Sequence, residues 1–452
     1  MNKRLHVALA TLALTSWYAT DVCSQPEMPD SALSAVARTG LKGPGSFQRI
    51  TVAAVADRTI SAPKGSTDQT RAIQSALDAL RPGQRLVFLP GTYVVSHSLV
   101  VPTQGAVVSG YGASLIATDP DDQALLVTGS GATVAGLTLR GTGHKRLETE
   151  SSAKIVVRGK DIQILDTTIE GGASAGIFVS HSARIVVARN KVQKTLADGI
   201  HVTGASRDVL ISNNTVTGTG DDLIAIVSYK KDGALSRNVL VTHNTVSGNY
   251  WGRGLSVVGG ADVTLSENDV RGVQKAAGIM VAHEDGYRTY NVRNVVIAHN
   301  VVSDIEDPAY RGNGLPPAEQ AGIDINTGDE DVALVAVKDN HVSRASYDGF
   351  RALGNVCRFD VANTTFSSIT GSAISLQTNH CAPSEMTCSA NTLDGKSIPQ
   401  EPGCRGSGKL VVTGADVSRL PAVDLQVLAA HKPDPDPADA NGHAVARSSA
   451  KQ

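Results

Sequence analysis

The chain has 452 residues, with 41 lysines and arginines against 43 aspartates and glutamates, so its formal net charge is close to zero. This balance argues against a nucleic-acid partner or a membrane surface that is bound through bulk charge. Glycine occurs 44 times, aromatic residues make up only 4%, and the apolar residues lie in short runs of Val, Ile, Leu and Ala. Such a composition favours strands over helices.

The first residues have the pattern of a secretory signal, and we expect residues 1–24 to be a signal peptide. Lys3 and Arg4 precede an apolar run that ends at about Ala19, and small residues follow. Residues 25–60 form a Gly/Pro-rich lead-in segment. No other run is long enough to span a bilayer. We therefore expect a secreted or periplasmic protein without a membrane span.

Residues 61–102 contain the one good amphipathic helical pattern. Ser66 and Gln69 have capping-box spacing, and Pro82 follows the last apolar position. We predict a helix at about 67–80 that caps an open stack of strands, whose end would otherwise expose apolar side chains. The apolar stripe consists of Ala72, Ile73, Ala76, Leu77 and Leu80.

Beyond residue 130, two short patterns alternate along the chain. One places an Asn or Asp before a small strand, and the other places a Gly before an alternating apolar strand, as in "AGIFV" and "DGIHV". Stacking these units predicts an all-β fold, a right-handed parallel β-helix over residues 61–410. The recurrent asparagines would bond the backbone of neighbouring coils and take no part in catalysis. They include Asn190, Asn214, Asn244, Asn268, Asn300, Asn340 and Asn363.

The last part of the chain is expected to hold a cap, a tail and two disulfides. Residues 411–431 are predicted to cap the C-terminal end, and the polar, Pro-rich residues 432–452 to be disordered. Four cysteines lie late in the chain, which in an exported protein indicates disulfides and allows three pairings. The turn-rich stretch between two of them favours the pairs Cys381–Cys388 and Cys357–Cys404.

Three aspartates are the strongest catalytic candidates. Residues just before the Gly position of successive coils lie above one another, so Asp198 and Asp222 should be one coil apart, about 4.7 to 4.9 Å between backbones. Asp221 adjoins them. Like charges this close disfavour full ionisation, so one carboxyl should keep its proton to a higher pH. An isolated Asp-Asp pair would indicate a turn, but a third carboxylate favours the acid and base that cleave a glycosidic bond.

Other side chains on the same face are candidate substrate ligands. His201 lies on the outward side and could act as a base or ligand, oriented by Asp198. Trp251, in the inserted turn "GNYWGRG", could stack on a sugar ring. The remaining candidates, which a solvated surface would also explain, are Tyr229, Lys230, Arg253, His283, Asp324 and Arg351.

The motifs "DGI", "GDDLIAI", "GRGLSVVGG" and "AGIMVAH" resemble, in order and spacing, the four motifs of polygalacturonases. Residues 61–102 resemble the start of a β-helix of the pectate-lyase superfamily. The resemblance implies that Asp221 is the general acid and that Asp198 and Asp222 activate water. The part of the chain that resembles the polygalacturonase site is residues 195–285.

The chain departs from the polygalacturonase pattern at two places. Arg253 stands where the family has a His between two glycines. The Arg-Ile-Lys triplet that grips the uronate carboxylate is replaced by Met280, Val281 and Ala282. We therefore do not expect plain galacturonan as substrate, and we expect another polysaccharide, preferably an acidic one.

Three functions stay open at this point. The first is an exported glycoside hydrolase that acts with inversion and needs no metal or cofactor. The second is a polyuronate lyase or C5-epimerase, in which Arg253, His201, Tyr229 and Lys230 would serve, and clustered carboxylates could hold Ca²⁺. The third is a non-catalytic β-helix that binds a polysaccharide during export or adhesion.

Overall fold

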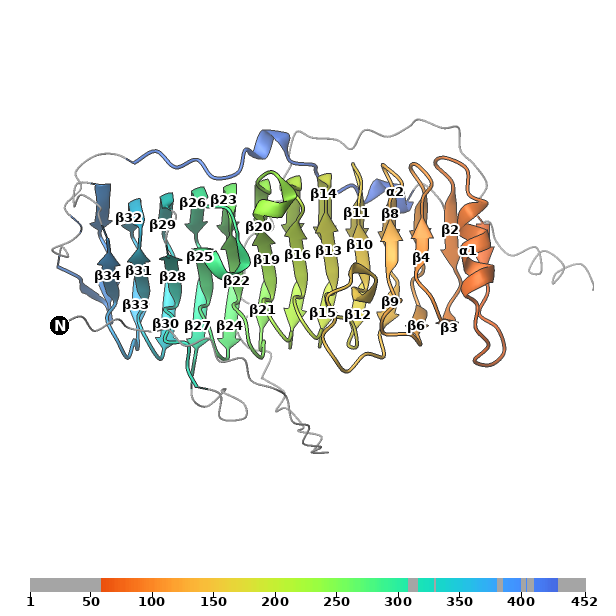
Figure 1. Cartoon of the computed structure of the whole chain (residues 1–452), viewed down its shortest axis with the longest axis horizontal. Coiled ribbons are helices and arrows are strands. Elements are labelled where there is room, and N and C mark those ends of the chain that lie inside the picture. Colours follow the sequence, from red (N-terminus) through yellow and green to blue (C-terminus); the bar gives the residue numbers. More distant parts are fainter. Residues whose placement is uncertain are drawn as a thin grey trace, which may run out of the picture. The chain divides into compact units, whose positions relative to one another are not determined.

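The computed structural model describes residues 58–307, 316–328, 331–379, 385–399, 404 and 410–429. The predicted signal peptide, most of the lead-in segment and the tail lie outside the described residues. The strands form three sheets in which every pairing is parallel except that of the last two strands. Each coil of the chain gives one strand to each sheet, and Figure 1 shows the strands of successive coils side by side. The predicted parallel β-helix is confirmed.

Within each sheet the strands follow one another in space in the order of the chain. The first sheet contains β1 (Arg58–Ile60), β2 (Arg85–Phe88), β5 (Val107–Ser109), β8 (Thr133–Ala135), β11 (Gln163–Leu165), β14 (Ala183–Ala188), β17 (Arg207–Ser212), β20 (Arg237–Thr242), β23 (Gly260–Ser266), β26 (Val292–Ala298), β29 (Val332–Lys338), β32 (Val356–Ala362) and β35 (Met386–Ser389). The second sheet contains β4 (Leu99–Val101), β7 (Leu125–Val127), β10 (Ile155–Val157), β13 (Ile177–Ser180), β16 (Ile200–Thr203), β19 (Ile224–Val227), β22 (Leu255–Val258), β25 (Ile279–His283), β28 (Ile323–Thr327), β31 (Phe350–Gly354) and β34 (Ile374–Thr378). The third sheet contains β3 (Gly91–Val95), β6 (Ala113–Ala117), β9 (Thr138–Arg140), β12 (Thr168–Glu170), β15 (Lys191–Gln193), β18 (Thr215–Thr217), β21 (Thr245–Ser247), β24 (Asp269–Val273), β27 (Val301–Ile305), β30 (His341–Ala345), β33 (Thr365–Ser367), β36 (Thr392–Leu393) and β37 (Lys396–Ser397).

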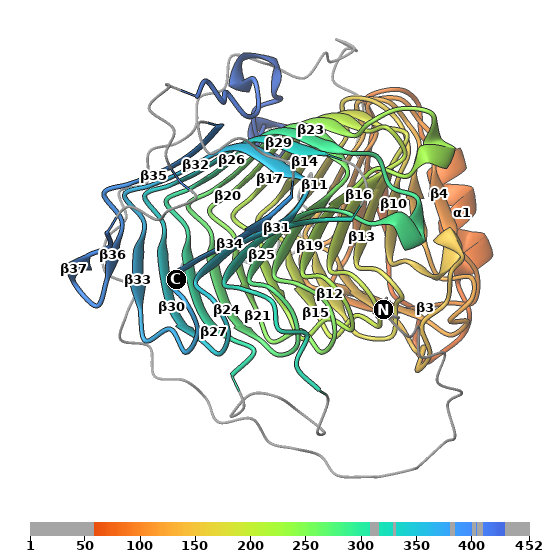
Figure 2. The same ribbon diagram turned by 60° about the vertical axis from the view of Figure 1, so that its left-hand side comes forward.

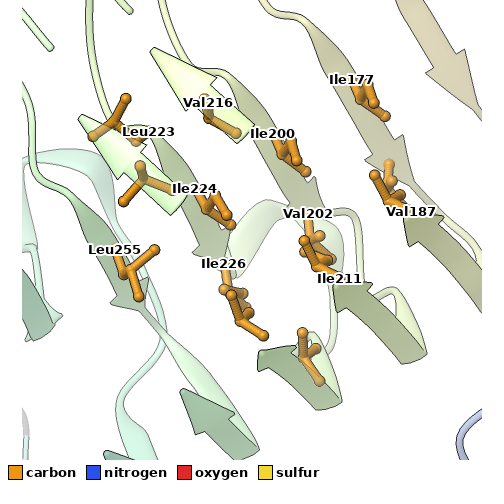
Figure 3. Close-up of a cluster of buried hydrophobic side chains, with 14 of the residues drawn as sticks. Ile177, Val187, Ile200, Val202, Ile211, Val216, Leu223, Ile224, Ile226 and Leu255 are labelled. Atoms are coloured by element: carbon orange, nitrogen blue, oxygen red, sulfur yellow. The ribbon is translucent and has the colours of Figure 1, made fainter. Parts of the chain in front are cut away.

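The interior is filled by rows of aliphatic side chains. Parallel pairing places Ile177, Ile200, Ile224 and Leu255 at the same position of four neighbouring strands of the second sheet. All four are fully buried, and Figure 3 shows them in adjacent strands. Alternate residues of these strands point outward, because side chains of a strand alternate between its faces. The outward row of the second sheet carries the candidate site.

The predicted amphipathic helix is present as α1 (Thr70–Asp78), which buries Ile73 and Leu77 in the core. The capping box expected from Ser66 and Gln69 does not form. Gln69 is the N-cap residue but makes no capping hydrogen bond with its side chain, and the Thr70 N–H donates to Asp68 Oδ1 at 3.0 Å. The Asp68 side chain lies close enough to accept a hydrogen bond from the Thr70 N–H, the first of the helix, so this donor needs no capping box.

An asparagine ladder joins the coils at the turn from the first to the third sheet. The backbone N–H of Asn214 donates to Asn244 Oδ1 at 2.9 Å, and Asn244 Nδ2 donates to the Ile211 carbonyl at 3.1 Å. The same bonds repeat at Asn190, Asn268, Asn300 and Asn340. Asn363 is an exception: Thr364 takes the ladder position and donates its N–H to Asn391 Oδ1, while Asn363 is exposed.

Residues 410–429, part of the segment expected to cap the C-terminal end, run along the outer side of the first sheet. Backbone N–H groups of Thr413, Asp416 and Asp424 donate to side chains of successively earlier coils. Leu420 packs in an apolar cluster with Leu210 of β17 and Leu240 of β20. The segment includes η6 (Val417–Arg419) and α2 (Gln426–Ala429), and Figure 2 shows it in blue on the side of the first sheet.

The disulfide prediction is wrong. Cys388 of β35 is bonded to Cys404, with their Cα atoms 5.4 Å apart. Neither Cys381–Cys388 nor Cys357–Cys404 can therefore form, although Cys357 is also disulfide-bonded. Cysteines pair where the fold brings their Cβ atoms together, not where they are close in sequence; Cys381 lies outside the described residues.

Within the described residues, no helix is long and apolar enough to cross a bilayer.

Candidate active site

The three predicted aspartates lie on two successive turns that lead from the third sheet into the second sheet. Asp198 precedes β16, and Asp221 and Asp222 precede β19. Because β16 and β19 are paired neighbours, the two turns are one coil apart, the spacing that the repeat predicts. The Asp222 N–H donates to Asp198 Oδ1 at 3.0 Å and ties the turns together.

Asp222 is enclosed by protein donors. Its carboxylate accepts hydrogen bonds from the Arg253 N–H at 2.6 Å and from Ser256 Oγ at 2.5 Å, and the residue is only 5% exposed. Burial raises the pKa of Asp222, and the nearby Arg253 guanidinium, 3.5 Å away, opposes this shift. A Cβ atom at position 252, in the neighbouring turn, would overlap both Asp221 and Asp222, so only glycine fits at this position.

Asp221 is the most accessible carboxyl of the cluster, with 19% of its side chain exposed. Burial raises its pKa to about 7, the charges of Asp222 and Asp198 add to the rise, and Arg146 opposes it. Arg146 Nη1 lies 2.5 Å from Asp221 Oδ2. A carboxyl with this pKa still holds its proton in a large fraction of molecules at neutral pH.

Asp198 and His201 form a second, adjacent unit. Asp198 Oδ2 lies 2.5 Å from His201 Nδ1, and the imidazole stacks on Phe178 of β13 with ring centroids 5.2 Å apart. A carboxylate only accepts hydrogen bonds, so Nδ1 carries the hydrogen and Nε2 keeps its lone pair in the neutral ring. His201 is 7% exposed, and its buried Nε2 has no hydrogen-bond partner among the described residues.

A cavity of about 350 Å³ opens beside this unit on the outer face of the second sheet. Its floor includes Phe178 and His201, and its walls come from the loop between β9 and β10 and from η2 (Lys230–Asp232). Burial, together with Asp198 and Glu284, raises the pKa of Tyr229 at the edge of η2. The polar lining includes Arg146, Asp198, Tyr229 and Lys231; the predicted Lys230 is exposed and does not line the cavity.

Arg253 is committed to the protein rather than to a ligand. Its Nη2 bonds to Glu284 and its Nε donates to Met280 Sδ at 3.2 Å. Burial acts to lower the pKa of Arg253, but attraction to Asp222 and Glu284 outweighs it and raises the pKa overall. Arg253 is therefore a fixed positive charge beneath the aspartates.

The remaining candidates lie further along the face. Asp324 and Arg351 form a buried ion pair of 2.8 Å on β28 and β31, three or more coils from Asp222, and burial raises the pKa of Asp324 to about 6. His283 at the end of β25 is also buried. Trp251, in contrast, is half exposed on the turn before β22. No group of three or more His, Cys, Asp or Glu residues within the described ranges is arranged to hold a metal ion.

Several contacting residues were not among the predicted site residues. Arg146 lies 75 residues before Asp221, on the long connection between β9 and β10, and only that insertion marks it in the sequence. Phe178 and Ser256 could have been inferred, because they share the outward position of His201, Phe178 on the adjacent strand β13 and Ser256 two strands away on β22. Glu284 follows His283 in the polar stretch "AHEDG" at the end of β25, which is the signal that points to it.

A family model that matches the sequence identifies the protein family. A family model described as "Right handed beta helix region" matches residues 123–270 and 175–418. The chain belongs to this family. The right-handed β-helix is therefore established, in agreement with the three parallel sheets.

Solved β-helix structures show the same fold at low sequence identity. The catalytic domain of a glycoside hydrolase family 87 α-1,3-glucanase variant in complex with tetrasaccharides is 16% identical, with a TM-score of 0.56, and the match covers 75% of this chain and 67% of that one. The mannuronan C-5 epimerase A-module from Azotobacter vinelandii is 15% identical, with a TM-score of 0.51 and coverage of 74% and 97%. The Dettilon tailspike protein is 17% identical, with a TM-score of 0.53 and coverage of 74% and 70%. No curated protein sequence matches the chain.

Proposed function

We propose that this β-helix protein is an exported glycoside hydrolase that cleaves a polysaccharide with inversion. The observation that carries the proposal is the Asp221 carboxyl, whose pKa is raised to about 7 beside two further carboxylates. A general acid works best with a pKa near the working pH. The names of two β-helix neighbours, an α-1,3-glucanase and a mannuronan epimerase, support action on a polysaccharide.

In this mechanism Asp221 donates its proton to the leaving glycosidic oxygen as the bond to the anomeric carbon breaks. Asp198 accepts a proton from the water molecule whose oxygen forms the new bond to that carbon. His201 and the Asp222 N–H orient the Asp198 carboxylate, and each of its oxygens keeps a further lone pair for the water. A base that activates water, instead of attacking the sugar, inverts the configuration.

The proposed role of Asp222 is electrostatic. Its side chain is only 7% exposed, against 13% for that of Asp198, so it is less accessible to the attacking water. The buried Arg253 charge favours ionisation of Asp222, whereas Arg146 beside Asp221 is about half exposed and screened by solvent. When one proton is bound by the pair Asp221 and Asp222, we therefore expect it on Asp221.

We propose an acidic polysaccharide as the substrate. Arg146 and Lys231 line the cavity beside Asp198. Arg146 is also paired with Asp221, and Arg253, which does not line the cavity, is bonded to Glu284. Arg146 and Lys231 would bind the sugar carboxylate by direct contact rather than through the net charge of the cavity, which four carboxylates also line: Glu148, Glu150, Asp198 and Asp232. A volume of about 350 Å³ lies within the usual range of ligand pockets.

A polyuronate lyase or C5-epimerase is the second candidate, and the His201 geometry favours it. His201, Tyr229 and Arg146 line the same cavity. His201 Nε2 has a lone pair and no hydrogen-bond partner among the described residues, and Tyr229 carries a hydroxyl group. His201 Nε2 could accept the proton next to the sugar carboxylate while Arg146 neutralises the developing charge. In a lyase, the glycosidic oxygen on the adjacent carbon then leaves as the carbon–carbon double bond forms. A C5-epimerase would return a proton to the opposite face.

The products distinguish these functions. We expect the protein to release new reducing ends, without ultraviolet absorbance, from an acidic polymer such as mannuronan; α-1,3-glucan and polygalacturonate serve as the neutral and the galacturonan comparisons. Turnover should fall about tenfold per pH unit above about 7, because Asp221 loses its proton there. Reducing-end assays and absorbance over a pH series measure both.

New chain ends that are unsaturated and absorb ultraviolet light would show that the protein is a lyase and not a hydrolase. A changed uronate composition at constant chain length would indicate an epimerase. Retention of a polymer on the protein without any chemical change would indicate the non-catalytic binder.

A further inference from the structure

Trp251 is an exposed aromatic side chain on an anchored turn. Its side chain is half exposed, while the turn around it is fixed by the Tyr250 N–H, which donates to the Thr219 carbonyl at 2.8 Å. Asn249 Nδ2 donates to the carbonyls of Asp221 and Arg253 at 3.3 and 3.2 Å. The indole is thus held on the same turn network as the proposed acid.

One face of the indole is already covered. Lys275 Nζ lies 4.4 Å from the ring centroid and also donates to the Pro316 carbonyl at 2.9 Å, which holds the lysine in place. About half of the residue is exposed to solvent. An aromatic ring that is rigidly held and open on one side is suited to stacking on the apolar face of a sugar ring.

Trp251 and the cavity lie on opposite sides of Asp221 along the stack of coils. The cavity lies over β13 and β16, Asp221 belongs to the coil of β19, and Trp251 belongs to the coil of β22. Successive coils are about 4.7 to 4.9 Å apart. The acid therefore lies between two surfaces that can each bind sugar.

We propose that Trp251 is a sugar-stacking subsite and that the polysaccharide lies along the stacking direction of the coils, from the cavity across Asp221 to Trp251. Sugar rings are then bound on both sides of the bond that is cleaved. Cleavage occurs within the polymer rather than one sugar at a time from its end. This inference rests on the proposed hydrolase function.

The test uses Asp221→Asn, which leaves the ligand uncleaved, and intrinsic tryptophan fluorescence. The chain has two tryptophans, of which Trp17 lies in the predicted signal peptide. The variant Asp221→Asn/Trp251→Phe measures any fluorescence that does not come from Trp251. The probes are short and long oligosaccharides of α-1,3-glucan, mannuronan and polygalacturonate. Long oligosaccharides of one series should change the Trp251 fluorescence, and Trp251→Ala should weaken their binding about tenfold, with short ones nearly unaffected.

Tyr111→Ala is the matched control, because Tyr111 is also about half exposed but lies near Asp166, outside the cavity and the turn of Trp251. This change should leave the affinity unaltered, and Trp251→Phe should restore most of it. Viscosity of the polymer that the parent protein cleaves should fall early, as internal cleavage requires.

Each outcome decides between the two proposals. Trp251-dependent binding without cleavage by the parent protein supports the subsite and rejects the hydrolase. Cleavage with no fluorescence change, with unaltered affinity in Trp251→Ala, or with release of single sugars from an end overturns the subsite. Neither binding nor cleavage of any of the three series overturns both.

Discussion

Replacement of Asp221 by Asn should lower turnover about 10²- to 10⁴-fold while polymer binding persists, because the variant cannot donate a proton to the leaving oxygen. The amide has nearly the shape of the carboxyl, so the turn held by Thr219 and Asn249 should stay intact. Initial rates and binding isotherms of the parent and the variant, on the polymer that the parent cleaves, measure the two effects separately.

The same variant should melt no lower than the parent protein, and its advantage should depend on pH. The folded pKa of Asp221 is raised to about 7, so the native state holds a proton that the unfolded chain releases above about pH 4. The free energy of unfolding of the parent therefore falls as pH rises from about 4 to 7, and Asn removes this loss. An aspartate that only capped its turn would instead make the variant less stable by about 0.5 to 2 kcal/mol at neutral pH.

Replacement of Asn244 by Ala should destabilise the protein by about 3 to 5 kcal/mol, because several buried polar groups lose their partners. The Asn214 N–H and Nδ2 both donate to Asn244 Oδ1, and Asn244 Nδ2 donates to Asn268 Oδ1. Chemical denaturation measures the loss.

Thr245→Ala is the control for this change, because Thr245 follows in the chain and is exposed, and it should cost at most about 1 kcal/mol. Turnover per folded molecule should be unchanged in Asn244→Ala, since the ladder lies at a different turn from the aspartates. Equal stability of the two variants would mean that the ladder does not hold the coils together.

The fold was predictable because it repeats. The alternation around Gly176 and Gly199 and the recurrent asparagines report local geometry that every coil shares, so the period alone places Asp198 one coil from Asp222. No such rule applies to contacts that leave the repeat. The path of residues 410–429 beside the first sheet and the Cys388–Cys404 bond each depend on a non-repeating segment.

The site was predictable to the same extent. The aspartates belong to the repeat and were found, and so was the short contact between His201 and Asp198, three residues apart. Arg146 contacts Asp221 from an insertion two coils before the coil of Asp198. The period of the repeat does not encode the length of this insertion or the direction in which it runs. The contact of Ser256 with Asp222, in contrast, follows from the outward position that Ser256 shares with His201 and could have been inferred.

The central claim is that Asp221 is an acid that keeps its proton near neutral pH, and a carboxyl titration followed by infrared or carbon NMR spectroscopy tests it without a known substrate. We expect one carboxyl signal of the folded parent protein to titrate near pH 7 and to be missing in Asp221→Asn. A parent spectrum in which Asp221 is fully ionised by about pH 5 would contradict the account, because the carboxyl would then have an ordinary aspartate pKa and could not serve as the acid.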